Sequence, residues 1–363
     1  MKVAVVWNNG MGQVVNRFGR PCPEKYGHTA VERVVDGLRE GGHQVDLFEA
    51  DVTLLDRLRH FMPSDPATGT PTGIVFNMAY GIQGDCRYTH VPAMLEMAGI
   101  PYTGSSPMGH TLALDKVITK TLLRAAGVPT PHWLVASCGE VDPDRLRLPL
   151  IVKPRHESTS FGLRLVRNRE ELCRAVGAVL NDYSQEALVE EFIEGREVCI
   201  GLLGNGVPRC LPPVELDFGT RDCHAFTWED KMHQRLDEPR KICPAELSPA
   251  LQRRLRDISV ATFQACHCRD YARVDIRIDS SGEPYVLEIN SMASLGASAS
   301  YVLASGAVGH SFSSLVCGIV DVAHRRYFGL PAPISRADGA EVLASIDSTA
   351  TATGGQPSEF LAY

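Results

Sequence analysis

The clearest alternation of polar and apolar residues lies between positions 273 and 290. Residues Arg273-Val274-Asp275-Ile276-Arg277-Ile278 alternate, as do Tyr285-Val286-Leu287-Glu288-Ile289-Asn290, and Asp279-Ser280-Ser281-Gly282 lies between them. The pattern predicts a β-hairpin. Because side chains alternate between the faces of a strand, a register that sets Ile276 and Ile278 beside Leu287 and Tyr285 also sets Asp275 opposite Glu288 and Arg273 opposite Asn290.

In that register two carboxylates and an amide share one face of the hairpin. Like charges opposed across a sheet repel each other, and hard oxygen ligands that leave room for phosphates suit Mg²⁺. We therefore predict that Asp275, Glu288 and Asn290 bind metal, with Arg273 available to stabilise developing negative charge. The alternative is a solvated strand face on which Arg273 and Arg277 neutralise the acids.

Strand and helix patterns alternate in the first part of the chain. Apolar runs predict strands at 3–7, 44–49 and 73–77, and an amphipathic pattern predicts a helix over 29–40. This order is typical of a parallel α/β sheet, which binds ligands at the ends of its strands. Asn8, Asn77 and Tyr80 follow predicted strands and are therefore binding candidates.

We divide the chain into four parts. Residues 1–115 form the N-terminal α/β unit, and a helix predicted over 111–126 crosses its end. Residues 116–203 form a central unit with strands at 150–153 and 188–192 and a helix over 169–180. Residues 204–330 form a third unit that carries the hairpin. Residues 331–363, rich in Ala, Ser, Thr, Gly and Pro, are expected to be a flexible tail.

Composition narrows the function classes. The net charge of −7 and the lack of a long basic run argue against a nucleic-acid partner. The apolar N-terminus predicts a buried strand instead of a secretion signal, and no apolar stretch approaches membrane-spanning length. Eleven cysteines, an odd number at irregular spacings, favour reduced thiols in a cytoplasmic protein. Cys266-His267-Cys268 does not favour zinc, because adjacent ligands on a predicted helix point in different directions.

Two further stretches suggest a nucleotide site. Lys153 ends an apolar strand and precedes a loop of small hydroxyl residues that closes on Gly162, here called the 154–162 loop. Such a loop can offer backbone N–H groups to a polyphosphate while a lysine supplies charge. Residues 190–197 follow a second apolar run and offer acids beside an aromatic ring, which suits adenine and ribose. The alternatives are a surface turn with one exposed lysine and a charged strand terminus.

Two short motifs suggest other enzymes. Asp217-Phe218-Gly219 matches the magnesium motif of protein kinases, but the catalytic loop that should precede it is missing. Gly10-Met11-Gly12 begins like a dinucleotide fingerprint but lacks its third glycine. Neither a kinase nor a nicotinamide enzyme is therefore expected.

The order of these motifs resembles the ATP-grasp ligases, and within them the D-alanine–D-alanine ligase family. The resemblance covers residues 1 to about 330. The stretches that carry it are Phe76-Asn77-Met78-Ala79-Tyr80-Gly81, Pro101-Tyr102-Thr103-Gly104-Ser105, Leu114-Asp115-Lys116, Gly127-Val128-Pro129-Thr130-Pro131, Ile151-Val152-Lys153-Pro154, Val189-Glu190-Glu191-Phe192, Arg273-Val274-Asp275 and Glu288-Ile289-Asn290. It implies an α/β (α+β) ATP-grasp fold behind a Rossmann-like pre-ATP-grasp domain.

The resemblance also implies roles for individual residues. Lys116 and Lys153 would contact phosphates or adenine, and Lys231 would reach the phosphates from a lid. Thr159 and Ser160 would lie in the loop that covers the phosphates. Adenine and ribose would be held by Glu190, Phe192, Ile193 and Glu197. Two Mg²⁺ ions, replaceable by Mn²⁺, would bind Asp275, Glu288 and Asn290, and Arg273 would stabilise the tetrahedral intermediate.

The sequence departs from the family pattern where amino-acid substrates should bind. D-alanine ligases usually have His in place of Tyr80, Tyr in place of Met232, and a Ser-Pro-Gly-Met-Thr loop where this chain reads Ser291-Met292-Ala293-Ser294-Leu295 before Gly296. We predict that Tyr80, Met232, Ser294 and Gly296 contact substrate, with Glu24 as the acid that meets the first substrate's amine. Buried polar partners are costly to exchange, so the acceptor site is expected to differ from that for D-alanine.

The predicted activity is ATP- and Mg²⁺-dependent ligation of a carboxylate to an amine, on amino-acid-like substrates and in specialised biosynthesis. A true D-alanine–D-alanine ligase is the first alternative. A non-catalytic ATP-binding module and a carboxylate kinase that stops at the acyl phosphate are the others. Relatives suggest a homodimer, by analogy alone.

Overall fold

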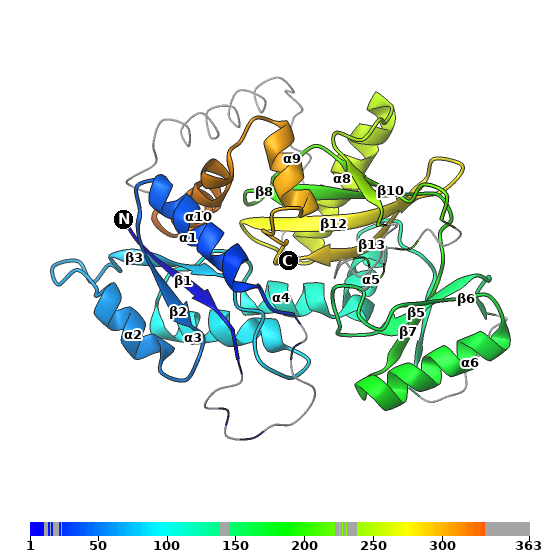
Figure 1. Cartoon of the computed structure of the whole chain (residues 1–363), viewed down its shortest axis with the longest axis horizontal. Coiled ribbons are helices and arrows are strands. Elements are labelled where there is room, and N and C mark those ends of the chain that lie inside the picture. Colours follow the sequence, from blue (N-terminus) through cyan, green and yellow to red (C-terminus); the bar gives the residue numbers. More distant parts are fainter. Residues whose placement is uncertain are drawn as a thin grey trace.

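The computed structural model in Figure 1 describes residues 1–10, 14, 16, 22, 24–137, 145–221, 225, 227, 230 and 238–330. The predictions for Lys231, Met232 and the tail at 331–363 lie outside the described residues. Among those residues the strands form three sheets of three, six and four strands. The mixture of helices with parallel and antiparallel sheets confirms the predicted α/β class.

The first sheet is parallel, with the order β2 (Gln44–Glu49), β1 (Lys2–Trp7), β3 (Gly73–Asn77). Its apolar runs are buried on both faces by helices, as a parallel sheet requires. The helices of this unit are α1 (His28–Glu40), α2 (Leu54–Phe61) and α3 (His90–Ala98), with the short 3₁₀ helix η1 (Arg87–Thr89) before α3.

One predicted helix is two in the structure. Where we predicted a helix over 111–126, α4 (Pro107–Leu114) ends and α5 (Lys116–Ala125) begins on either side of Asp115. Asp115 has an extended backbone, and its carboxylate accepts hydrogen bonds from the backbone N–H groups of Val117 and Ile118. This N-cap starts a new helix, because it satisfies donors that a continuous helix would have used internally.

The second sheet is antiparallel, with the order β4 (Trp133–Ala136), β7 (Ala187–Glu191), β5 (Leu150–Pro154), β6 (Arg164–Val166). The helix α6 (Arg169–Ala178), extended by the π-helical turn η3 (Val179–Tyr183), covers its outer face (Figure 1). Leu172, Val176 and Val179 pack there against Val152 and Val189 of the strands.

The third sheet has the order β11 (Arg240–Ile242), β10 (Val214–Asp217), β8 (Arg196–Leu203), β12 (Tyr271–Ile278), β13 (Pro284–Asn290), and β9 (Arg209–Cys210) pairs with β8. The helix α8 (Pro249–Ala265) packs against it. The predicted division at residue 203 groups β8 with the central unit. Hydrogen bonds to β10 and β12 instead join β8 to this sheet, so by hydrogen bonding the units separate between β7 and β8.

The last described helices, α9 (Ser300–Ala307) and α10 (Phe312–Phe328), bring the chain back to its beginning. Figure 1 shows α10 beside α1, and Val34 and Leu38 of α1 share a core cluster with Leu315 and Val316 of α10. Gly37 makes the close approach feasible, because a Cβ there would lie only 3.2 Å from the Val316 side chain.

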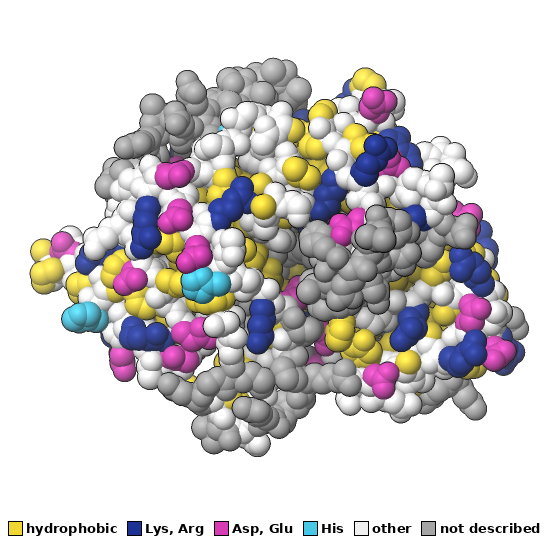
Figure 2. Space-filling model, viewed as in Figure 1, with side chains coloured by type: hydrophobic (Ala, Val, Ile, Leu, Met, Phe, Trp, Pro, Cys, Tyr) yellow, Lys and Arg dark blue, Asp and Glu magenta, His cyan; other side chains and the backbone are white. Residues whose placement is uncertain are grey.

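No single described helix is long and apolar enough to cross a membrane, and α9 with α10 meets the length and composition test only as a pair bent by 100°. On the face shown in Figure 2, described basic and acidic side chains are interspersed. Among these described side chains, no patch of basic residues alone, such as a polyanion would bind, is seen on that face.

Candidate functional site

A cavity of about 570 Å³ lies between the two antiparallel sheets and reaches the N-terminal unit. Apart from the strand-end candidates Asn8 and Asn77, all described residues that the sequence analysis named as binding or catalytic line it. They are Glu24, Tyr80, Lys116, Lys153, Thr159, Ser160, Glu190, Phe192, Ile193, Glu197, Arg273, Asp275, Glu288, Asn290, Ser294 and Gly296. Residues more than 260 positions apart in the chain therefore share one site. Lys231 and Met232 are not among the residues that the structure describes.

The hairpin register agrees with the prediction at the acids but not beyond them. Asp275 pairs with Glu288 and Arg273 with Asn290, as predicted. The predicted pairings of Ile276 with Leu287 and of Ile278 with Tyr285 are wrong, because the register shifts after Asp275. Ile276 lies opposite Val286 and Ile278 opposite Pro284. An extra residue in one strand bends it and re-aims its side chains. Leu287 consequently lines the cavity together with Glu288, which period-two alternation did not predict.

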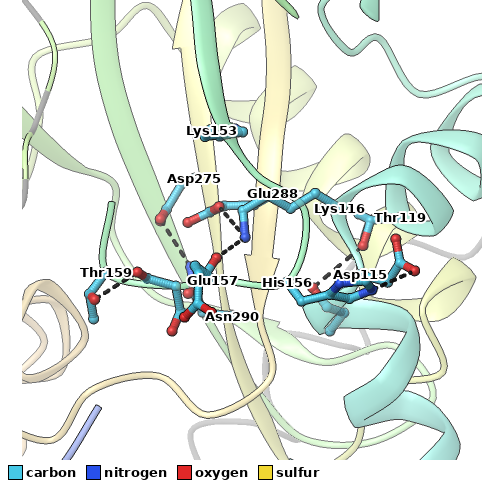
Figure 3. A network of polar contacts seen from close by, with 12 residues as sticks. Asp115, Lys116, Thr119, Lys153, His156, Glu157, Thr159, Asp275, Glu288 and Asn290 are labelled. Carbon is cyan, nitrogen blue, oxygen red and sulfur yellow. Dashed lines mark hydrogen bonds and ion pairs between the residues drawn. The ribbon is translucent and has the colours of Figure 1, made fainter. Parts of the chain in front are cut away.

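The predicted metal ligands lie together and are already engaged with cations (Figure 3). The Arg273 guanidinium donates to both carboxylate oxygens of Asp275 at 2.6 and 2.7 Å, and the Asn290 amide donates to the same carboxylate at 3.0 Å. Lys116 Nζ lies 3.9 Å from the Glu288 carboxylate. The acids therefore face the cavity and are also paired with Arg273 and Lys116, and metal binding by them stays a prediction.

The donor set fits Mg²⁺. Asp275, Glu288 and Asn290 offer oxygen ligands on one wall of a cavity with room for further ligands, and Mg²⁺ usually takes one or two carboxylates plus phosphate oxygens and water. A cluster of three or more His, Cys, Asp or Glu is not found among the described residues. The set predicted here needs only two acids and an amide.

Glu190 is the buried counter-ion of two lysines. Its carboxylate lies 2.5 Å from Lys153 Nζ and 2.7 Å from Lys120 Nζ. Burial lowers the pKa of Lys120 to about 8, although Glu190 opposes this shift. Burial acts in the same direction on Lys153, but Glu190 and Glu288 outweigh it and raise the pKa. Sequence reasoning missed Lys120, which lies on α5 with only helical periodicity as a signal.

Lys116 is positioned by its neighbour Asp115. The carboxylate of Asp115 caps α5 and also accepts hydrogen bonds from Arg155 at 2.7 Å and from His156 at 3.2 Å (Figure 3). Burial would raise the pKa of Asp115, but the His156 and Arg155 hydrogen bonds outweigh it and hold the pKa well below its usual range. Lys116 Nζ donates to the backbone oxygen of Glu157, so α5 is bound to the 154–162 loop.

The 154–162 loop has an unusual backbone. Thr159 and Ser160 have φ angles of 55° and 59°, in the left-handed region that non-glycine residues rarely occupy. Such conformations cost about 1–3 kcal/mol each and are concentrated at ligand sites. Gly162 has a φ of 78°, and a Cβ there would lie 2.8 Å from the Tyr183 ring. The loop conformation is therefore imposed by its surroundings.

The segment between β7 and β8 is held by Arg277. The guanidinium lies 4.6 Å from the centre of the Phe192 ring and donates to the Glu197 carboxylate at 2.9 Å. It also donates to the backbone oxygens of Ile193 and Gly195. Phe192, Ile193 and Glu197 are thus fixed along one side of the cavity by one arginine of β12, which sequence reasoning had considered only as a neutralising charge.

At the N-terminal end of the cavity aromatic residues surround Glu24. The rings of Tyr26 and Tyr80 stack with centroids 5.1 Å apart, and the Tyr26 hydroxyl accepts a hydrogen bond from the Leu295 N–H at 3.2 Å. Tyr88 donates to the Glu24 carboxylate. Sequence reasoning missed Tyr26 and Tyr88, because nothing local marks residues that meet only after the units assemble.

Two of the strand-end candidates are structural. The Asn8 side chain accepts from the Gly81 N–H at 2.9 Å and donates to the Ala50 oxygen at 3.1 Å. The Asn77 side chain accepts from the Ala79 N–H at 3.1 Å. Both are buried and neither lines the cavity. The prediction that they bind ligand is therefore wrong, because the Asn8 amide and the Asn77 side-chain oxygen are used to order the loops that follow the strands.

Comparison with known proteins agrees with this architecture. A family profile described as D-ala D-ala ligase C-terminus matches residues 122–321. The chain is 54% identical over 334 residues to the uncharacterized protein y4sG of Sinorhizobium fredii, covering 91% of this chain and 98% of that one. It is 30% identical over 305 residues to a D-alanine–D-alanine ligase of Bordetella petrii, covering 82% and 90%.

A solved structure shares the fold. The D-alanine–D-alanine ligase of Bacillus anthracis complexed with ATP aligns with a TM-score of 0.69 at 21% sequence identity, over 90% of this chain and 98% of that one. The matched profile covers more than half of the chain, and the match to the Bordetella petrii ligase extends over most of both proteins. The chain therefore belongs to the D-alanine–D-alanine ligase family, and it is an ATP-dependent ligase of ATP-grasp fold in a family that uses ATP and Mg²⁺.

Proposed function

We propose that this enzyme activates a carboxylate as an acyl phosphate and joins it to an amine, forming a peptide-like bond between amino acids or amino-acid-like molecules. The observation that carries the proposal is the cavity itself. Lysines, a backbone-strained hydroxyl loop, opposed carboxylates and an arginine converge there from the two antiparallel sheets and the helix α5. Such convergence suits phosphoryl transfer, in which catalysis is mostly positioning and charge stabilisation.

The nucleotide would lie between the two antiparallel sheets. Glu190, Phe192, Ile193 and Glu197 would hold adenine and ribose, and Lys116, Lys153, Thr159 and Ser160 would hold the phosphates. ATP would supply the γ-phosphoryl group, and Asp275, Glu288 and Asn290 would hold Mg²⁺, which would offset the charge of the phosphate oxygens. Lys231, outside the described residues, would complete the set from a lid.

The chemistry has two steps. A substrate carboxylate oxygen attacks the γ-phosphorus, and ADP leaves with the electrons of the broken bond. An amine then attacks the carbonyl carbon of the acyl phosphate, the amine loses a proton, and inorganic phosphate leaves. Arg273 stabilises the oxyanion of the tetrahedral intermediate, since the Asp275 carboxylate outweighs the effect of burial and keeps the guanidinium charged. No side-chain nucleophile is required.

The residues predicted to bind the amino-acid substrates favour an amino acid other than D-alanine. Tyr80 stacks on Tyr26 at the wall where Glu24 would meet the first amine, and the loop with Ser294 and Gly296 departs from the family pattern. When the polar residues of a buried site are exchanged for others, the site accepts a different substrate. Ligation in specialised biosynthesis is therefore our first hypothesis and D-alanine–D-alanine ligation the second. A homodimer and a cytoplasmic location remain predictions.

The test is a substrate panel. Purified protein with ATP, Mg²⁺ and pairs of D- and L-amino acids should release phosphate and form a new amide detected by mass, and excess EDTA should stop both. ADP release without any ligated product would contradict the proposal. Trapping of a hydroxamate by hydroxylamine without amide would identify a carboxylate kinase, and tight ATP binding without turnover would identify a binding module.

A further inference from the structure

Two residues of η1 connect the N-terminal unit with the 154–162 loop. The Arg87 guanidinium, 3% exposed, donates to the His156 backbone oxygen at 3.0 Å and to the Glu157 carboxylate at 3.3 Å. Its neighbour Tyr88 is 6% exposed and places its hydroxyl 3.2 Å from Ser158 Oγ. Arg87 and Tyr88 of one short helix therefore contact the three consecutive loop residues 156–158.

The Tyr88 hydroxyl also contacts the Glu24 carboxylate. A phenol has one proton to donate, and the contact with Glu24 uses it, so the directions follow. Tyr88 donates to Glu24, and the Ser158 hydroxyl donates to the Tyr88 oxygen. The result is a chain Ser158–Tyr88–Glu24, one end of which lies beside the strained residue Thr159 and the other at the wall of the cavity.

Tyr88 does not itself line the cavity. Its ring packs against Tyr80 at 5.4 Å between centroids and against His110 at 6.2 Å, so the ring belongs to the aromatic core. Burial raises the pKa of Tyr88 well above its usual value, which keeps the phenol protonated as a donor. The ring has a packing role, and only the hydroxyl reaches the two polar groups.

We propose that Tyr88 is a positioning residue whose hydroxyl couples substrate binding at Glu24 to the 154–162 loop. The inference rests on the proposed function, in which Glu24 meets the amine of the first amino acid and the loop covers the ATP phosphates. This chain of hydrogen bonds holds the Glu24 carboxylate and Ser158 at a fixed separation, and so keeps the amino acid and the γ-phosphoryl group aligned. Without the Tyr88 hydroxyl, water competes better with the substrate carboxylate for the γ-phosphoryl group, because small misplacements are costly to the intended reaction.

Tyr88→Phe is the direct test, because it keeps the ring and removes the hydroxyl. Tyr102→Phe is the matched control, since the Tyr102 hydroxyl also donates to a carboxylate, that of Glu96 at 2.7 Å, away from the cavity. We expect Tyr88→Phe to lower kcat for amide formation about 10- to 100-fold with little change in KM for ATP, and to release more phosphate per amide formed. Tyr102→Phe should change neither.

Ser158→Ala breaks the same hydrogen-bond chain at its other end. It also replaces Tyr88→Phe as the test if that variant folds poorly. Because both variants break one chain, the double variant should lose no more kcat than the worse single variant, whereas independent effects would multiply. Losses in Tyr88→Phe no larger than in Tyr102→Phe, an unchanged ratio of phosphate to amide, or multiplied losses in the double variant would overturn the proposal.

Failure of the proposed function is recognised separately, since the wild-type enzyme would then form no amide with any pair in the panel. Hydrogen–deuterium exchange of residues 155–162 without ligand then decides the structural part. Faster exchange in Tyr88→Phe than in both wild type and Tyr102→Phe supports the coupling of Tyr88 to the loop. Equal exchange in all three proteins rejects it.

Discussion

Asp275 illustrates how single residues prepare the site. Its carboxylate accepts two hydrogen bonds from Arg273 and one from Asn290, on the wall that also presents Glu288. Burial alone would lower the pKa of Arg273, but the Asp275 carboxylate outweighs it and raises the pKa, so the arginine is always charged. These charges are arranged before any ligand arrives. The reaction therefore needs no reorientation of surrounding groups of the kind that water molecules would have to undergo.

Replacing Glu288 by Gln is expected to lower kcat about 100-fold or more while leaving the fold intact, because one of two opposed carboxylates loses its charge. Steady-state phosphate release and circular dichroism measure the two effects. Glu283→Gln, on the same hairpin and in an exposed pair with Arg254, is the control and should keep full activity. Equal activity of the two variants would remove Glu288 from the metal site.

At the scale of elements, one buried carboxylate joins three of them. Glu190 on β7 contacts Lys153 on β5 and Lys120 on α5, and Lys120 donates further to the Thr130 hydroxyl at 2.8 Å. The four-stranded sheet is thereby bound to the helix that begins with Lys116. Removing one partner of a buried pair is costly, since the remaining charges stay buried without compensation.

Glu190→Gln should therefore lower the free energy of unfolding by about 3–5 kcal/mol. Glu191→Gln, the next residue of β7, is the matched control, because its partner Arg147 is 87% exposed and such a pair contributes at most about 1 kcal/mol. Urea unfolding of both variants measures the difference. A loss in Glu190→Gln as small as in Glu191→Gln would mean that the two lysines find other partners.

At the scale of the whole molecule, contacts between distant segments hold the units around the cavity. His110 of α4 is fully buried, and its Nδ1 lies 2.8 Å from the hydroxyl of Ser291, which directly follows β13. This contact joins the N-terminal part of the chain to the hairpin. Burial lowers the pKa of His110 to about 3.

This shift makes folding stability depend on pH. Below the unfolded value of 6.5 the unfolded chain binds a proton at His110 that the native state does not, so stability is complete above pH 6.5 and is lost as the pH falls toward 3. Between about pH 7 and pH 5 the wild type should lose about 2 kcal/mol more than His110→Asn. Urea unfolding at both pH values tests this, and parallel losses would show that His110 titrates normally.

Local patterns determined much of this protein. The period of two in residues 273–278 and 285–290 determined which acids face each other, and the apolar runs determined the strands of the parallel sheet. The ordered motifs placed the chain in its family and indicated the residues that line one cavity. These features are readable because side-chain direction within a strand or helix depends only on neighbours a few positions away.

Other features were decided only by tertiary structure. The shift after Asp275, the new helix at Lys116 and the union of β8 with β12 each depend on hydrogen-bond partners that periodicity does not specify. Lys120 faces Glu190 across 70 positions of sequence. Tyr88 reaches Glu24 across 64 positions and Ser158 across 70. Burial, pairing and pKa at such residues arise when separate units close on one another, which is a property of the assembled fold.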